Sequence, residues 1–179
     1  MKLYHTSDAI IEHPDIRRGR VNADFGQGFY LTPDYEFSCR WTNRDAYINE
    51  YELDMEGLCV VELARDADWL DYIMHNRRRQ DLREADVVMG PIANDTIFDT
   101  MGIISSGFLA LQATLELLQI GPEYRQVVIK TDRANEQLRW IGAKQVQVDE
   151  AVFEARRQEA LEYQQLFAAC MQRLTEDTE

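Results

Sequence analysis

Asp24-Phe-Gly-Gln-Gly-Phe-Tyr-Leu-Thr32 is a segment in which two glycines lead into an apolar, aromatic run. We expect a buried strand over residues 28–32, because aromatic and β-branched residues bounded by glycine and proline are typical of strands. Glycine allows another backbone or a ligand to approach closely, so Gly28 is a candidate contact for a ligand that lies against the ring of Tyr30. The structural alternative is a glycine-rich turn that leads into a core strand.

Other predicted strands gather toward the two ends of the chain, around a helical middle. Apolar and alternating patterns predict them over 2–6, 48–53, 58–63, 85–89, 126–131 and 145–148. Strands 48–53 and 58–63 are expected to form a hairpin or two neighbouring edges. Helical spacing and capping residues predict helices over 34–46, 66–79, 94–101, 105–120, 132–140 and 150–174. Because strands and helices do not alternate regularly, the pattern favours an α+β fold over a doubly wound parallel sheet.

The length of 179 residues suits one domain, which we place over 1–149, followed by a C-terminal helix over 150–179. The helix either packs on the domain or extends from it. Its apolar stripe is expected to pack on the core, and docking to a partner is the alternative. The residues of this stripe are Val152, Phe153, Leu161, Leu166 and Phe167.

Charge and composition exclude several classes of protein. The net charge of −13 opposes general nucleic-acid binding, since a phosphate backbone would be repelled. The three cysteines, Cys39, Cys59 and Cys170, contain no C-x-x-C pair, so neither a zinc site nor any other metal site is expected. No apolar run approaches the roughly 20 residues that span a bilayer. We therefore expect a cytoplasmic protein without a membrane partner.

His5 is the histidine that lies within a predicted strand, next to the hydroxyl residues Thr6 and Ser7. A single strand histidine is more often a satisfied structural group than a catalytic one. By itself, His5 therefore indicates no activity.

Several short motifs and their order along the chain resemble a bacterial domain family of uncharacterised function that is grouped with the ADP-ribosyltransferase superfamily. The resemblance covers roughly residues 1–142 and implies a split, mixed or antiparallel β core with flanking helices, and NAD as the substrate. The motifs are Tyr4-His-Thr-Ser7, the segment 24–32, Trp41, Gly90-Pro-Ile-Ala-Asn94-Asp95 and Gln126-Val-Val-Ile-Lys-Thr131.

The resemblance also implies roles for the matching residues. His5 would hydrogen-bond the adenosine ribose, Thr6 would reach the nicotinamide through its backbone, and Tyr30 would stack on the nicotinamide ring. Asn94 and Asp95 are expected to face the ligand, with helix N-capping an equally good role for Asn94. Among the arginines, Arg44 or Arg77 is expected to meet the NAD pyrophosphate through paired hydrogen bonds.

The third catalytic position departs from the superfamily pattern. The strand that opens with glutamate in the superfamily opens here with Gln126, and a neutral amide keeps a hydrogen bond but supplies no charge. Glu123 lies three residues earlier and is the alternative source of a carboxylate. We rank Gln126 above Glu123 as the site residue.

The resemblance therefore implies a mono-ADP-ribosyltransferase, with His5, Tyr30 and Gln126 as catalytic residues, that acts on an unknown acceptor such as a protein. A toxin with an antitoxin partner, or an effector, would fit the bacterial setting of the family. The alternative is an NAD-binding module that is weak or inactive, and a third interpretation is an interaction domain whose acidic C-terminal helix holds a partner.

Overall fold

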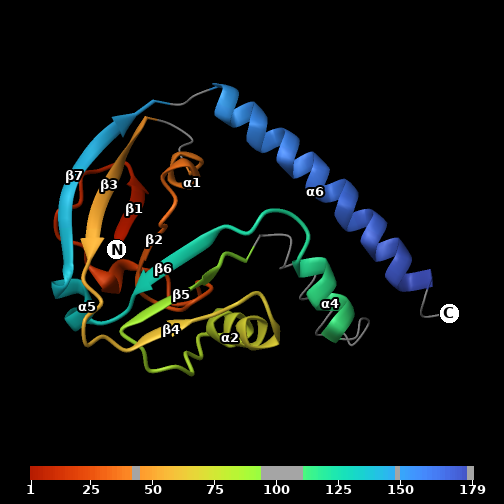
Figure 1. The fold of residues 1–179 in the computed structure, drawn as a ribbon, viewed down its shortest axis with the longest axis horizontal. Coiled ribbons are helices and arrows are strands. Elements are labelled where there is room, and N and C mark those ends of the chain that lie inside the picture. The colour runs from red at the N-terminus through yellow and green to blue at the C-terminus, as the bar shows by residue number, and fades with distance from the viewer. Residues whose placement is uncertain (42–44, 94–110, 148–149, 177–179) are drawn as a thin grey trace.

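The computed structural model describes residues 1–41, 45–93, 111–147 and 150–176. In these ranges the chain forms a mixed α+β fold, as predicted, and ends in a long helix (Figure 1). The strands are β1 (Lys2–Ser7), β2 (Phe29–Leu31), β3 (Ala46–Leu53), β4 (Val60–Glu62), β5 (Val87–Pro91), β6 (Arg125–Ile129) and β7 (Leu138–Val146). The helices are α1 (Tyr35–Cys39), α2 (Ala67–Arg77), α4 (Leu111–Leu118), α5 (Asp132–Glu136) and α6 (Glu150–Glu176), with a short 3-10 turn at Ile16–Arg18.

The strands form two sheets. One is antiparallel with the order β1-β3-β7, and the other has the order β2-β6-β5-β4, in which β4 and β5 run parallel. In the described ranges, the two sheets are joined by one bridge, where Tyr4 and Thr32 exchange backbone hydrogen bonds of 2.8 and 2.9 Å. Past this bridge β1 and β2 diverge, so each presents a strand edge to the other.

Two apolar clusters lie on opposite faces of the four-stranded sheet. Along β6, Val127 and Ile129 face the cluster between the two sheets, which also holds Leu3 and Tyr51. Val128 faces the other cluster, where α2 covers the sheet with Trp69 and neighbouring apolar residues. This alternation follows from the two-residue period of a strand, and it makes β6 the centre of the structure.

The structure differs from the predicted elements in three regions of the chain. Strands 48–53 and 58–63, which correspond to β3 and β4, do not pair with each other. Both edges of β3 are occupied, one by β1 and the other by β7. Strand β4 instead lies beside β5, where Asp86 binds Cys59 through backbone and side-chain hydrogen bonds. The helix expected over 34–46 ends at Cys39, and Ala46 is already a buried residue of β3.

The third difference concerns the residues after β6. The helix expected over 132–140 ends at Glu136, and β7 begins at Leu138 rather than at 145, because 138–146 pair with β3 along its whole length. The helix expected over 105–120 is described as α4 from Leu111, and the part before it lies outside the described residues together with the helix predicted over 94–101.

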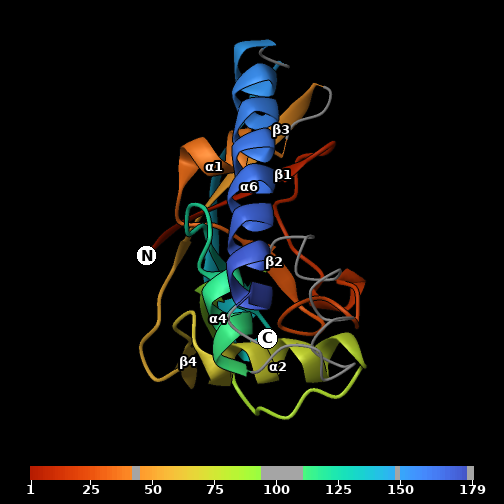
Figure 2. The ribbon, with the colours of Figure 1, turned by 90° about the vertical axis from the view of Figure 1, so that its right-hand side faces the viewer.

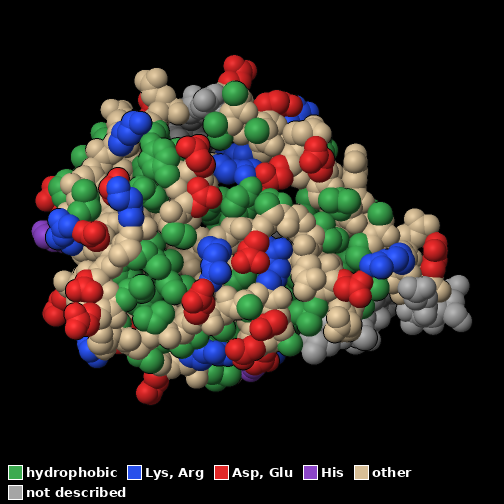
Figure 3. All heavy atoms as spheres, in the orientation of Figure 1, with side chains coloured by type: hydrophobic (Ala, Val, Ile, Leu, Met, Phe, Trp, Pro, Cys, Tyr) green, Lys and Arg blue, Asp and Glu red, His purple; other side chains and the backbone are tan. Residues whose placement is uncertain are grey.

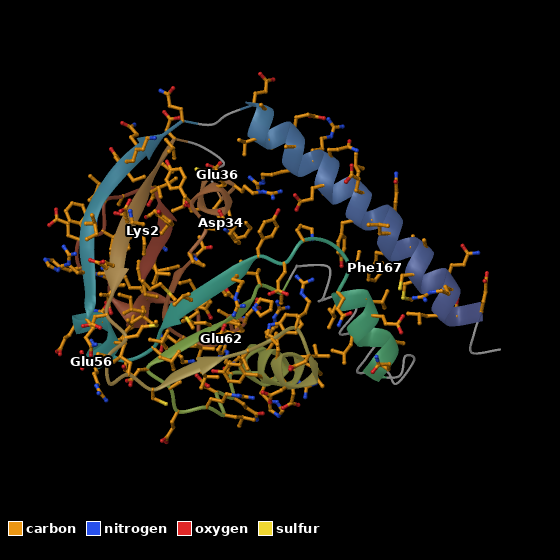
Figure 4. The ribbon with its side chains drawn as sticks, viewed as in Figure 1. Lys2, Asp34, Glu36, Glu56, Glu62 and Phe167 are labelled. Atoms are coloured by element: carbon orange, nitrogen blue, oxygen red, sulfur yellow. The ribbon has the colours of Figure 1, made fainter. Side chains whose placement is uncertain are left out.

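Helix α6 runs along one side of the molecule, from the end of β7 past α4 (Figures 1 and 2). Tyr163 is its buried residue, and it packs against Gly121. Phe167 of α6 lies where this helix contacts α4 (Figure 4). Phe153, Leu161 and Leu166 are 57%, 46% and 56% exposed, so the prediction that they pack on the core is wrong. Helix α6 instead contacts the rest of the protein partly through polar side chains, and the spacing of its apolar residues does not predict these contacts.

Among the described residues, no helix is both long enough and apolar enough to cross a bilayer.

Gly28 provides a test of the packing between β2 and β6. A Cβ atom at Gly28 would lie 2.5 Å from Val128 Cγ1 and 2.6 Å from the Ile129 carbonyl oxygen, whereas one at Gly142 would meet nothing within 4 Å. We expect Gly28→Ala to lower the free energy of unfolding by about 1–3 kcal/mol, because overpacked sites force the backbone to shift. Urea denaturation measures this, with Gly142→Ala as the matched control; equal stability of the two variants would contradict the expectation.

Candidate functional site

The junction of β1 and β2 brings His5 and Tyr30 together. Nδ1 of His5 lies 2.7 Å from the carbonyl oxygen of Tyr30, and the imidazole rests on the ring of Phe29 with 4.4 Å between ring centroids. The reason is local: Thr32 turns its backbone groups toward β1, so Tyr30, two residues earlier, points its carbonyl to the same edge. The strands have already diverged there, and the histidine side chain satisfies the carbonyl in place of a strand.

Burial lowers the pKa of His5 below its usual value of about 6.5, and the hydrogen bond to the Tyr30 carbonyl opposes this shift only in part. His5 is therefore neutral near pH 7. Because a carbonyl oxygen only accepts, the Nδ1 atom carries the proton, and Nε2 is left as an acceptor. The ring can thus accept a hydrogen bond from a ligand hydroxyl.

The hydroxyl of Tyr30 is held in the loop that precedes β2. It donates to the Gly26 carbonyl oxygen at 2.7 Å and accepts from the Phe25 backbone N–H at 3.0 Å. Burial and, to a lesser degree, the negative charge of Asp24 raise the pKa of Tyr30 well above its usual value. The tyrosine is therefore a fixed, neutral ring and not an acid or base.

Gln126 lies on the same face of the sheet as Tyr30. Tyr30 pairs with Val128, and Gln126 is two residues from Val128 on β6, so the two side chains are diagonal neighbours. The residue is 8% exposed, and its Nε2 atom has no hydrogen-bond partner within the described ranges. A buried amide N–H without an acceptor costs about 1–3 kcal/mol, which a ligand oxygen would recover.

The other residues that the sequence predicted for the site have different surroundings in the structure. The backbone of Thr6 points to the same β1 edge as that of Tyr4, toward β2, while its hydroxyl donates to the Ser38 carbonyl oxygen at 2.5 Å. Gly28 packs tightly on β6, which gives it a structural role. Glu123 is exposed in the loop before β6. Arg44, Asn94 and Asp95 lie outside the described residues.

Arg77 is bound to Asp24 inside the protein. Its Nε and Nη2 atoms donate to Oδ1 of Asp24 at 2.9 and 2.6 Å, and the two side chains are 7% and 14% exposed. The other carboxylate oxygen accepts from the Ala93 backbone N–H at 3.2 Å. The pair thus joins the loop before β2 to α2 and to the end of β5. Sequence reasoning missed this role of Asp24, although the residue opens the segment 24–32.

A second group that sequence reasoning missed continues along the same face. Tyr124 precedes Gln126 by two residues, and its hydroxyl lies 3.1 and 3.2 Å from the carboxylate oxygens of Glu159. Arg40, next to the end of α1, binds both Tyr124 and Glu159. The two-residue spacing of Tyr124 and Gln126 was a usable signal, but nothing local places Glu159 here, because it arrives on α6.

No group of three or more His, Cys, Asp or Glu side chains in the described ranges is arranged to hold a metal ion.

A family model for proteins of unknown function, DUF3990, matches residues 1–140. The chain belongs to the DUF3990 family. The matched region contains His5, Tyr30 and Gln126 and ends within β7, so α6 lies beyond it. No curated protein and no solved structure matches this DUF3990 protein.

The neutral state of His5 predicts a pH dependence of stability. A group whose pKa is lowered on folding supports the folded state above its unfolded pKa and loses that support as the pH falls. We therefore expect the free energy of unfolding to drop more between pH 7.5 and 5.5 in the wild type than in His5→Gln. Urea titrations at both pH values measure this, with His13→Gln at an exposed histidine as the control. Equal pH effects in the two variants would refute the assignment.

Proposed function

We propose that this protein binds NAD at the junction of His5, Tyr30 and Gln126 and transfers its ADP-ribose to an acceptor. One observation carries the proposal: three residues separated by up to 121 positions lie on three strands that meet, with His5 bound to the carbonyl of Tyr30 and Gln126 diagonal to Tyr30. The arrangement of the sheets, joined at one bridge and split beyond it, agrees with the split β core that the ADP-ribosyltransferase resemblance implies.

Each side chain has a role that its state in the fold allows. The Nε2 atom of His5 accepts a hydrogen bond from a ribose hydroxyl, and the fixed ring of Tyr30 offers a face to the nicotinamide. The free N–H of Gln126 donates to a ribose oxygen. The bond between the ribose carbon and nicotinamide then breaks, nicotinamide leaves with the electron pair, and the acceptor attacks the cationic carbon and releases a proton.

The amide of Gln126 favours a second candidate function, the binding of NAD without turnover. Cleavage develops positive charge on the ribose, and preorganised charge at that position is usually the largest catalytic contribution. Gln126 holds the ligand but offers no negative charge. An acceptor whose nucleophile is strong, or a carboxylate from elsewhere, is then needed for transfer.

Two measurements test the role of the Tyr30 ring. Calorimetry gives the affinity for NAD, and incubation with labelled NAD and a bacterial lysate gives the transfer of ADP-ribose. We expect Tyr30→Leu and His5→Ala to reduce both signals at least tenfold, because each removes a ligand contact. Tyr30→Phe keeps the ring face and should bind NAD like the wild type. Tyr35→Leu, at a half-buried tyrosine of α1, is the matched control. If Tyr30→Leu binds and transfers as well as the wild type, the site is wrong.

The two candidate functions are separated by Gln126→Glu. If the amide disarms the site, the carboxylate should raise nicotinamide release from NAD by about a hundred- to a thousandfold, the range that one electrostatic group typically supplies. Chromatography of nicotinamide measures the rate. A lower rate in Gln126→Glu would show instead that the amide is the working group, and wild-type release above background would establish turnover.

A further inference from the structure

A cavity of about 360 Å³ lies between the end of α1, the segment that leads into β6, and α6. Its walls include Phe37 and Trp41 from the region of α1, Tyr124 immediately before β6, and Tyr163 from α6. The volume falls in the range of small-molecule sites in proteins. Gln126 does not line this cavity, so it is separate from the NAD junction.

The lining is basic, in contrast to the chain as a whole. Among the described residues, the cavity is lined by three arginines, Arg40, Arg65 and Arg156, and by one acidic residue, Glu159, in a protein with a net charge of −13. Figure 3 shows basic side chains among acidic ones where α6 meets the rest of the molecule. Glu36 of α1 lies near the first turns of α6 (Figure 4), and it does not line the cavity. A concave site of this composition favours an anion.

Arg65 is the arginine best placed to bind that anion. Its Nη2 atom donates to the Pro122 carbonyl oxygen at 3.2 Å, while its buried Nε atom has no hydrogen-bond partner among the residues that the structure describes. Burial lowers the pKa of Arg65, and the charge of Glu123 offsets this only in part. In the part of the chain that the structure describes, no carboxylate lies within hydrogen-bond range of Arg65, and a ligand anion stabilises such a partly desolvated guanidinium. Arg40, in contrast, is already paired with Glu159 at 2.5 Å.

The aromatic walls indicate what the anion is attached to. Phe37 and Tyr124 stack with 4.2 Å between their ring centroids, and Trp41 meets Phe37 edge-on at 5.8 Å. Trp41 remains 58% exposed, so a large ring face at the rim is available. Aromatic faces bind planar rings through stacked or edge-to-face contacts.

We propose that this cavity binds a small ligand in which a planar ring is joined to a phosphate or carboxylate group. Arg65 binds the anionic group, and the exposed ring of Trp41 contacts the planar ring of the ligand. Because Tyr163 and Glu159 complete the wall, α6 is part of the site. The proposal does not depend on NAD binding at His5 and Tyr30.

Phenyl phosphate is the probe. Inorganic phosphate, which has only the anionic group, and phenol, which has only the ring, are the comparison ligands. Titrations of the full chain followed by protein NMR give the affinities. Phenyl phosphate should bind at least tenfold more tightly than either fragment and should shift the indole signal of Trp41. Equal affinity for phenyl phosphate and inorganic phosphate would overturn the proposal, since the ring would then contribute nothing.

Variants assign the binding to this cavity. Arg65→Gln should weaken phenyl phosphate at least tenfold, and Arg139→Gln, an exposed arginine of β7, should leave it unchanged. If Arg65→Gln does not fold, Trp41→Ala decides, because this exposed residue should be replaceable and its loss should weaken phenyl phosphate but not phosphate. Unchanged phenyl phosphate binding in a folded variant at either position overturns the proposal. His5→Ala should bind phenyl phosphate normally, which separates this test from that of the NAD junction.

Discussion

The two hydrogen bonds between the backbones of Tyr4 and Thr32 connect the two sheets. Every other pair among the described strands lies within one sheet or the other, so this bridge sets where the sheets meet. Since a bridge of one residue does not continue into a ladder, β1 and β2 separate at once. The separation creates the edge at which a histidine side chain, rather than a strand, satisfies the carbonyl of Tyr30.

The position of Gln126 relative to Tyr30 depends in turn on the β2–β6 register. Gly28 lies so close to Val128 and the Ile129 carbonyl that no larger residue fits there without movement. A slip of one residue would turn Tyr30 to the opposite face of the sheet and separate it from Gln126. The glycine therefore acts on the candidate site through packing, and a direct contact with a ligand is not needed to explain its presence.

Buried charges hold the loop that carries the Tyr30 hydroxyl. The Asp24–Arg77 pair anchors one end of this loop to α2, and Lys130 on the other side binds the Phe25 carbonyl oxygen and Asp81. Buried ion pairs contribute little net stability, because desolvation offsets their attraction, but removing one partner leaves a charge unpaired. Their effect here is to select one loop conformation, and with it one orientation of the tyrosine ring.

Local sequence was sufficient for most of the strands and for the α+β class, because period, glycine and capping residues act over a few neighbours. It also singled out His5, Tyr30 and Gln126, with their roles taken from a resemblance. Which strands pair, where α1 and α5 stop, and which face of α6 packs were decided only by the tertiary structure. The same holds for the Asp24–Arg77 pair and the arginine-lined cavity. These features join residues that are far apart in the chain, such as Arg40 and Glu159, and no local pattern encodes a contact between them.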